Sequence, residues 1–199
     1  MAEATDAPQR DRRRAEILAA AGRLFAERGI RETTVRQIAD QVGVMSGSLY
    51  YYFATKQEIV HALMRAYVED LVDRYCIHLS GEADARSQLQ RLVKTSLEAM
   101  LEHPHENAIL QHELGRMFRT EEFAYLPGAV AQIEEIYLAV IREGVKEGDI
   151  RSDIEPRFMF RTIMDVVKGA AYWYDPDVHD VEQVTSTWWK VLGRGVYSP

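Results

Sequence analysis

Residues 46–51 read SGSLYY and place hydroxyl groups and aromatic rings around a side chain as small as glycine. Serine hydroxyls can donate to base edges or phosphates, and a tyrosine can reach a phosphate or a thymine methyl group. Small side chains also let the backbone of a helix approach a duplex closely. This chemistry indicates recognition of double-stranded DNA. The predicted contacts in and around this run are Thr33, Thr34, Arg36, Ser46, Gly47, Ser48, Tyr50, Tyr51 and Lys56.

Two short helices must hold these side chains in place. The first is predicted over residues 34–42, because Thr34 and Gln37 can form a capping box at its start and Gly43 can end it in a left-handed conformation. The second is predicted over residues 46–53, where Leu49 and Phe53 are four residues apart and share the inward face. The serine and tyrosine side chains then point outward or to the flanks. The pattern is that of a helix-turn-helix.

The residue types and spacing of this stretch resemble the TetR family of bacterial regulators. That resemblance implies a three-helix DNA-binding head, a palindromic operator and a C-terminal bundle for a ligand and for dimerisation. Met45 stands where the family usually has serine or threonine, so the cap of the second helix is expected at Ser46. The family pattern is met by Thr33, Thr34, Ile38, Ala39, Gly43, Val44, Gly47, Leu49, Tyr50, Phe53 and Lys56.

Four arginines cluster at the start of the first long helix: Arg10, Arg12, Arg13 and Arg14. An isolated cluster of this kind is ordinarily a solvated helix start. Beside a helix-turn-helix it indicates contact with phosphates or with the minor groove, and we assign that contact to Arg12 and Arg13.

The charge distribution agrees with a single DNA-facing end, although the net charge of −7 and the pI near 5.4 do not suggest a nucleic-acid partner. Residues 1–56 carry nine Lys and Arg against seven Asp and Glu, a net +2, whereas residues 57–199 carry fifteen against twenty-four, a net −9. A mildly basic head on an acidic body would limit non-specific binding.

Several classes of site lack the residues they require. The single Cys76 excludes an internal disulfide and a multi-cysteine zinc site, and His103, His105 and His112 lack a partner at metal-ligand spacing. We predict no catalytic residues, no metal and no cofactor. We expect no apolar run to approach the length of a membrane span and find no signal peptide, so a cytoplasmic protein without a membrane partner is predicted.

The rest of the chain shows helical periods divided by short breaks, which predicts an all-α fold of one head and one bundle. The first long helix has an apolar stripe that ends at Gly29, and a capping box of Thr55 and Glu58 starts a helix that reaches about Leu79. Pro127 and Gly128 are expected to interrupt the chain. The predicted domains are residues 1–56, the arm and DNA-binding head, and residues 57–199, the ligand-binding and dimerisation domain.

The last two helices carry apolar residues on more than one face. One face can serve the core, and the surplus requires another partner. In the TetR family that partner is a second subunit, so a homodimer is expected. The predicted interface residues are Trp173, Trp188 and Trp189, although core packing alone can account for Trp188.

A narrower resemblance concerns the effector. The runs SGSLYYYF, HELGRMF, RFMFRTIMDVV and AYWYDP are similar to those of actinobacterial regulators of cholesterol and fatty-acid breakdown, whose ligands are acyl-CoA thioesters. An acyl chain requires an apolar tunnel and CoA phosphates require cations, although core packing explains most apolar candidates equally well. Met164 and Lys168 stand where those regulators carry an arginine and a tryptophan, so the effector need not be the same molecule. The predicted ligand contacts are Tyr67, Met100, Arg116, Tyr137, Arg157, Phe160, Arg161, Met164 and Lys168.

These patterns predict a homodimeric transcriptional repressor that binds a palindromic operator and releases it when a small molecule, such as an acyl-CoA, enters the C-terminal bundle. Two alternatives remain open at the level of sequence. One is a small-molecule-binding protein or enzyme whose helical head no longer reads DNA. The other is an activator, because the sign of regulation depends on where the operator lies.

Overall fold

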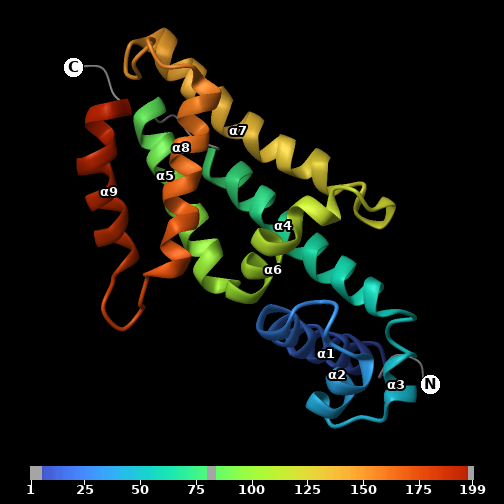
Figure 1. Cartoon of the computed structure of the whole chain (residues 1–199). Helices are drawn as coiled ribbons and strands as arrows, with labels where there is room; N and C mark the ends of the chain where they lie inside the picture. Colours follow the sequence, from blue (N-terminus) through green and yellow to red (C-terminus); the bar gives the residue numbers. More distant parts are fainter. Residues whose placement is uncertain (1–5, 80–83, 197–199) are drawn as a thin grey trace. The chain divides into compact units, whose positions relative to one another are not determined.

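The computed structural model describes residues 6–79 and 84–196, whose regular structure is helical apart from a single bridge residue at Ile150 (Figure 1). This confirms the predicted all-α class. The helices are α1 (Asp6–Arg28), α2 (Val35–Val42), α3 (Ser46–Leu49), α4 (Lys56–Leu79), α5 (Ala85–Glu102), α6 (Pro104–Met117), α7 (Leu126–Glu147), α8 (Pro156–Gly169) and α9 (Val181–Val196), with 3-10 turns η1 (Glu121–Phe123) and η2 (Ala170–Tyr172).

The chain forms two compact units. The head unit comprises Met1–Val68 and His105–Leu126, and the C-terminal unit comprises Glu69–Pro104 and Pro127–Pro199. The head unit therefore extends beyond residue 56, the end of the domain expected from the sequence, to take in the first half of α4 and all but the first residue of α6. The helix α4 is continuous from one unit into the other.

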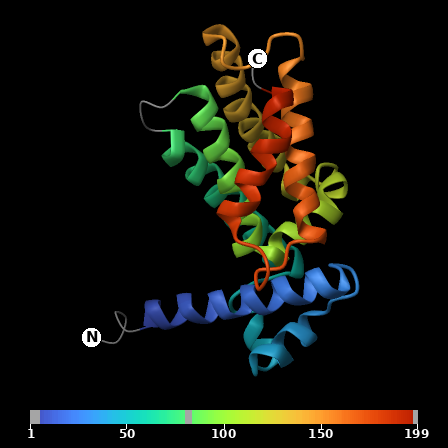
Figure 2. The same ribbon diagram turned by 90° about the vertical axis from the view of Figure 1, so that its left-hand side faces the viewer.

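Local sequence signals account for the first two helices of the head. The buried stripe of α1 includes Ile17, Ala21 and Phe25, and Gly29 follows its last residue with φ +87°. In Figure 2, α1 is seen lengthwise with the shorter head helices along one side. The predicted capping box of α2 is present: the Gln37 amide donates to Thr34 Oγ1 at 3.2 Å, and the Thr34 amide donates to Gln37 Oε1 at 2.8 Å.

The end of α2 also follows the prediction. Gly43 has φ +70°, a left-handed conformation that costs a glycine little. Its amide donates to the Asp40 carbonyl at 3.3 Å, and the Val44 amide donates to the Ala39 carbonyl at 3.0 Å. These bonds satisfy carbonyls that the last turn of α2 leaves without helical partners.

The second helix of the motif is shorter than predicted. It was expected over residues 46–53, but α3 covers Ser46–Leu49 and the chain then continues in turns. The Phe53 amide still donates to the Leu49 carbonyl at 3.1 Å, so the path of the chain remains close to helical.

The expected cap at Ser46 was wrong. Met45 occupies the cap position and makes no side-chain hydrogen bond, while Ser46 is the first residue of α3. The Met45 carbonyl accepts from the Ser48 amide at 2.9 Å, so the backbone begins the helix at Met45 whatever its side chain. The Met45 side chain is 82% exposed, and water is left to solvate the remaining amides.

The expected break at Pro127 and Gly128 was also wrong, because both residues lie in the first turn of α7. Proline is tolerated there, since the first amides of a helix have no helical acceptor. The start of α8 follows the same rule: Pro156 is its first residue, and the Glu155 carboxylate accepts from the Arg157 and Phe158 amides at 3.1 and 2.9 Å.

One stretch contradicts the expectation that no apolar run approaches the length of a membrane span. By length and composition alone, Glu121–Glu147 could cross a membrane, with a mean hydropathy of 1.2 over its most apolar window. Within this stretch, Tyr137 and Ile141 are buried in the core of the C-terminal unit, and Glu134 is paired with Arg157. A core helix satisfies the same length and composition test.

The C-terminal unit is built around α5. Helices α8 and α9 both lie against α5. Figure 2 shows α9 (red) beside α5 (green). Half of the residues of α5 are buried, including the polar Thr95 and Ser96. The main core cluster brings α5 together with Tyr75 of α4, Tyr137 of α7 and Met159 of α8.

Candidate nucleic-acid interface and effector region

The predicted DNA-contacting side chains of α3 lie at the surface of the head unit. Tyr50 and Tyr51 are 53% and 65% exposed, and a Cβ placed on Gly47 would meet nothing within 4 Å. On the opposite side, Leu49 and Phe53 are 0% and 1% exposed. The structure therefore presents an open surface of small and aromatic groups fixed from beneath by two buried side chains. Ser48, Thr34 and Arg36 are also exposed, and Ser46 is half-buried.

Thr33 does not belong to this surface, which corrects its expected contact with DNA. Its side chain is fully buried. Its hydroxyl lies 2.9 Å from the Gly29 carbonyl and 3.2 Å from the Leu24 carbonyl. The hydroxyl thus links the end of α1 to the segment that leads into α2.

Lys56 has partners that the sequence did not predict. Its Nζ donates to the carbonyls of Ile30, Arg31 and Thr33 at 2.6, 3.3 and 2.7 Å. These bonds use all three donors of the ammonium group and tie the start of α4 to the segment between α1 and α2. The geometry assigns Lys56 a structural role in the head, while its contact with a phosphate remains a prediction.

The start of α4 carries the capping residues expected from the sequence, with one difference. The Glu58 amide donates to Thr55 Oγ1 at 3.0 Å, as predicted. The Glu58 carboxylate, however, accepts from the Ala54 amide at 2.7 Å. Both bonds satisfy amides near a helix N-terminus.

The arginines of α1 divide into two pairs. Arg12 and Arg13, the predicted DNA contacts, both pair with Glu16, at 3.3 and 2.8 Å. Arg10 and Arg14, which were not predicted, lie over the rings of Tyr51 and Phe53. The spacing of four residues between Arg10 and Arg14 was the available signal, but their aromatic partners are distant in sequence.

In the C-terminal unit, a buried trio of hydroxyl groups includes the predicted ligand contact Tyr137. Ser96 Oγ lies 2.7 Å from Tyr75 Oη and 2.6 Å from Tyr137 Oη, and it donates to the Leu92 carbonyl at 2.8 Å. Because Ser96 has one proton, donation to Leu92 leaves it to accept from both tyrosines. The trio therefore links α4, α5 and α7 through polar contacts within an apolar core.

Burial changes the acidity of both tyrosines. Desolvation raises the pKa of Tyr75 to about 12, against a weaker lowering effect from its hydrogen bonds with Ser96 and Tyr137. Desolvation also raises the pKa of Tyr137 well above its usual value, and the nearby Tyr75 adds to the shift. Both hydroxyls therefore stay neutral throughout the physiological range and can act as hydrogen-bond donors.

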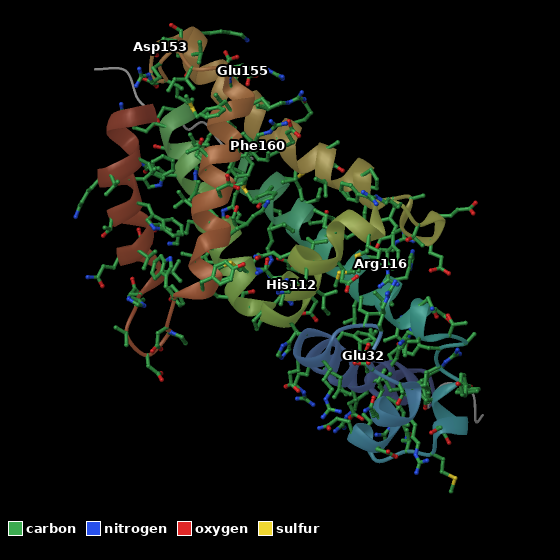
Figure 3. All side chains as sticks on the ribbon, in the orientation of Figure 1. Glu32, His112, Arg116, Asp153, Glu155 and Phe160 are labelled. Carbon is green, nitrogen blue, oxygen red and sulfur yellow. The ribbon has the colours of Figure 1, made fainter. Side chains whose placement is uncertain are left out.

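The structure brings together only some of the predicted ligand residues. Phe160 and Met164 of α8 pack against the core cluster that contains Tyr137, and the Tyr137 and Phe160 ring centroids are 5.3 Å apart. Figure 3 labels Phe160 on α8. Met100 belongs to a second cluster with Leu97 and Val184.

The predicted cations lie in different surroundings. Arg157 pairs with Glu134 at 2.5 Å, whereas Arg161 and Lys168 are exposed along α8. Arg116 belongs to the head unit, where it pairs with Glu113 at 3.4 Å, and Tyr67 is buried in that unit.

The three tryptophans differ in exposure. Trp173 is 47% exposed and its ring lies 6.2 Å, edge to face, from that of Trp188. Trp188 and Trp189 are half-buried against the core of the C-terminal unit. Other large apolar side chains of this unit are also exposed, namely Phe158, Tyr172, Val178 and Val191.

Comparison with protein families identifies the fold. Residues 17–63 match the family model described as "Bacterial regulatory proteins, tetR family", and residues 82–196 match "Tetracyclin repressor-like, C-terminal domain". The chain belongs to the TetR family. The predicted family is therefore confirmed.

Individual relatives agree with this assignment. The chain is 37% identical over 197 residues to the "HTH-type transcriptional repressor KstR2" of Rhodococcus jostii (strain RHA1), covering 98% of this chain and 97% of that protein. The solved ketosteroid transcriptional regulator KstR2 of Mycobacterium tuberculosis superposes with a TM-score of 0.89 at 34% identity, covering 94% of this chain and 96% of that one. AibR, solved in complex with isovaleryl coenzyme A and operator DNA, has the same fold, with a TM-score of 0.78 at 19% identity and coverage of 88% and 95%.

Regulators of the TetR family bind operator DNA and small-molecule effectors. This TetR-family chain is thus a transcriptional repressor related to KstR2 and not an enzyme. The similarity to a ketosteroid regulator also agrees with the narrower resemblance stated from the sequence.

The three carbonyl contacts of Lys56 predict a stability role that can be measured. We expect Lys56→Met to lower the free energy of unfolding by about 1–3 kcal/mol, because hydrogen bonds to a charged donor are lost and buried carbonyls are left without a partner. Urea denaturation would measure the change. Arg36→Met is the control, because the Arg36 side chain is 84% exposed and its contact with the Asp40 carboxylate is long, at 3.9 Å. An unchanged urea midpoint for Lys56→Met, with a weaker salt dependence of DNA binding, would instead place Lys56 on a phosphate.

The raised tyrosine pKa values predict a loss of stability in alkali. The unfolded chain releases these protons near the ordinary pKa of about 10, whereas folded Tyr75 holds its proton to about 12. Stability is therefore fully present below pH ~10 and is lost as pH rises toward 12, by at most about 1.4 kcal/mol per pH unit for each tyrosine. Urea midpoints measured across this range should fall more steeply for the wild type than for the Tyr75→Phe/Tyr137→Phe double variant. Parallel curves would show that the trio does not control the alkaline transition.

Proposed function

We propose that the chain is a homodimeric repressor that binds a palindromic operator and dissociates when an acyl-CoA thioester occupies its C-terminal unit. The observation that carries the proposal is the exposed surface of Ser48, Tyr50 and Tyr51, held on buried Leu49 and Phe53 within a TetR-family head. That surface has the size and chemistry to enter a major groove.

A palindromic operator requires two heads. In a twofold-symmetric dimer each reading helix would meet one half-site, and the two half-sites would lie about 34–36 Å apart, one turn of the duplex. The large apolar side chains that the C-terminal unit leaves exposed support dimerisation, because a second copy would remove them from water. We assign contact with a second copy to Trp173, Tyr172 and Val191, which are all exposed.

The proposed effector combines an apolar part and phosphates. Tyr137, Phe160 and Met164 offer apolar and aromatic surface at one place in the C-terminal unit. Arg161 and Lys168 are seven residues apart, so they lie on the same side of α8 and can approach phosphates. The isovaleryl coenzyme A in the AibR structure supports this chemical class, and the ketosteroid in the description of KstR2 supports only its apolar part.

Regulation follows from linkage. An effector that binds more tightly to the conformation with lower operator affinity must weaken DNA binding, at most by the ratio of its affinities for the two conformations. DNA must then weaken effector binding by the same factor. A regulator of this kind works where the bacterial chromosome lies, so we also propose a cytoplasmic location.

The DNA-binding part of the proposal predicts that the purified protein binds duplex DNA from upstream of its own gene. At physiological salt, replacement of Tyr50 or Tyr51 by alanine should abolish this binding without changing the dimer, because both rings lie at the surface. Fluorescence anisotropy would measure the DNA affinity and analytical ultracentrifugation the oligomeric state. Wild-type affinity in both variants would show that α3 is not the reading helix.

The effector part predicts that an acyl-CoA releases the bound operator. A titration of the protein–DNA complex with short-chain, long-chain and steroid-derived CoA thioesters would measure the release, with free CoA as the control for the acyl group. Release by one thioester and not by free CoA supports the proposal. If no thioester changed operator binding, the assignment as a repressor would stand and acyl-CoA thioesters would be rejected as effectors.

A further inference from the structure

The reading helix α3 has little capacity to hold its own conformation. It contains four residues, its cap residue Met45 makes no side-chain hydrogen bond, and residues 50–52 continue as turns. A helix this short gains too few hydrogen bonds to offset the cost of nucleation. Its geometry must therefore be imposed by contacts with the rest of the head unit.

Burial from beneath fixes only part of this segment. Leu49 and Phe53 are anchored in the core, but the Tyr51 ring points away from it and is 65% exposed. An exposed tyrosine ordinarily samples several rotamers. The Tyr51 ring nevertheless has two aromatic or cationic neighbours: the Tyr52 ring, edge to face with centroids 5.2 Å apart, and the Arg10 guanidinium, whose Cζ is 5.3 Å from the ring centroid.

A second arginine of α1 makes the equivalent contact one turn later. Arg14 Cζ lies 4.7 Å from the centroid of the Phe53 ring. Arg10 and Arg14 share a face of α1 because they are four residues apart. The guanidinium plane suits stacking on aromatic faces, which the compact ammonium of lysine does not reproduce.

This part of α1 lies outside the residues matched to the N-terminal family model, which begin at Ile17. The contacts of Arg10 and Arg14 therefore lie in a part of α1 that this family model does not cover. Between them, Arg12 and Arg13 pair with Glu16 and touch neither ring among the contacts found.

We propose that the start of α1 acts as a brace for the reading helix, in which Arg10 and Arg14 are positioning residues that hold Tyr51 and Phe53. Arg10 fixes the exposed Tyr51 ring in the orientation required at the DNA surface, and Arg14 covers the anchor beneath it. The inference rests on the proposed function in one respect, namely that Tyr51 meets DNA. It assigns Arg10 an indirect effect on DNA affinity, through Tyr51 and not through a phosphate.

A double-mutant cycle on operator binding separates these two roles. Arg10→Ala should weaken operator binding about 2- to 5-fold, the range expected from a cation–π contact at an exposed site. The cycle is measured at low salt, where phosphate contacts keep the residual binding of Tyr51→Ala detectable. There the same substitution should have no further effect in a Tyr51→Ala background. Arg10→Lys should not restore the wild-type affinity, and the slope of log Kd against log salt should stay unchanged. A phosphate contact would give the opposite results: additive losses, rescue by lysine and a slope reduced by about 0.9.

Hydrogen exchange of the free protein tests the brace without DNA. Amides of residues 49–53 should exchange about 2- to 5-fold faster in Arg10→Ala and in Arg14→Ala than in the wild type, because the same contact energy no longer opposes local opening. Arg12→Ala is the matched control, since the Arg12 side chain is 83% exposed and pairs only within α1. Exchange unchanged in both variants would overturn the proposal.

The two measurements also separate this inference from the proposed function. If residues 49–53 exchange faster in the arginine variants but the wild-type protein binds no operator, the brace would stand and the proposed DNA-binding function would be rejected. Faster exchange together with unchanged operator affinity in Arg10→Ala would show that the brace is structural only, and the positioning role would be rejected.

Discussion

A helix of four residues cannot keep its shape in water, so the DNA-facing surface of this protein depends on the burial of Leu49 and Phe53. Each is almost completely removed from solvent, and each burial contributes on the order of 2 kcal/mol, more than the hydrogen bonds within α3 can supply. Thr33 and Lys56 also support this surface, although they lie outside α3, because their hydrogen bonds fix the ends of α1, α2 and α4 to one another. The head therefore presents a short reading element on a scaffold whose rigidity comes from elsewhere.

The distance between interacting residues in sequence decides which parts of this site could be predicted. The capping box of Thr34 and Gln37 lies within one turn, and the positive φ of Gly43 is a property of the residue itself, so both were evident from sequence. The partners of Lys56 are 23 to 26 residues away. The residues next to Lys56 in sequence do not distinguish a lysine that binds backbone carbonyls from one that binds a DNA phosphate. The predicted cap at Ser46 was wrong for a different reason, because the backbone begins the helix at Met45 without a hydrogen bond from the Met45 side chain.

The C-terminal unit shows the same limit. The helical periods predicted its helices because one buried stripe per helix is enough to produce the pattern. The pairing of Arg157 with Glu134 could not be read in this way, since salt bridges between helices depend on how the helices cross. The hydroxyl trio was equally hidden, because Tyr75, Ser96 and Tyr137 come from three separate helices and each looks like an ordinary core or surface residue in isolation.

Helix α4 gives these separate observations a physical connection. Its first residue, Lys56, bonds to the carbonyls between α1 and α2 in the head unit, and Tyr75, near its other end, bonds to Ser96 in the C-terminal unit. Each contact fixes one part of α4 within its own unit: three carbonyls surround the Lys56 ammonium, and the Tyr75 hydroxyl bonds to Ser96. Because polar contacts have preferred distances and angles, they specify the position of each part of the helix more narrowly than apolar packing alone does.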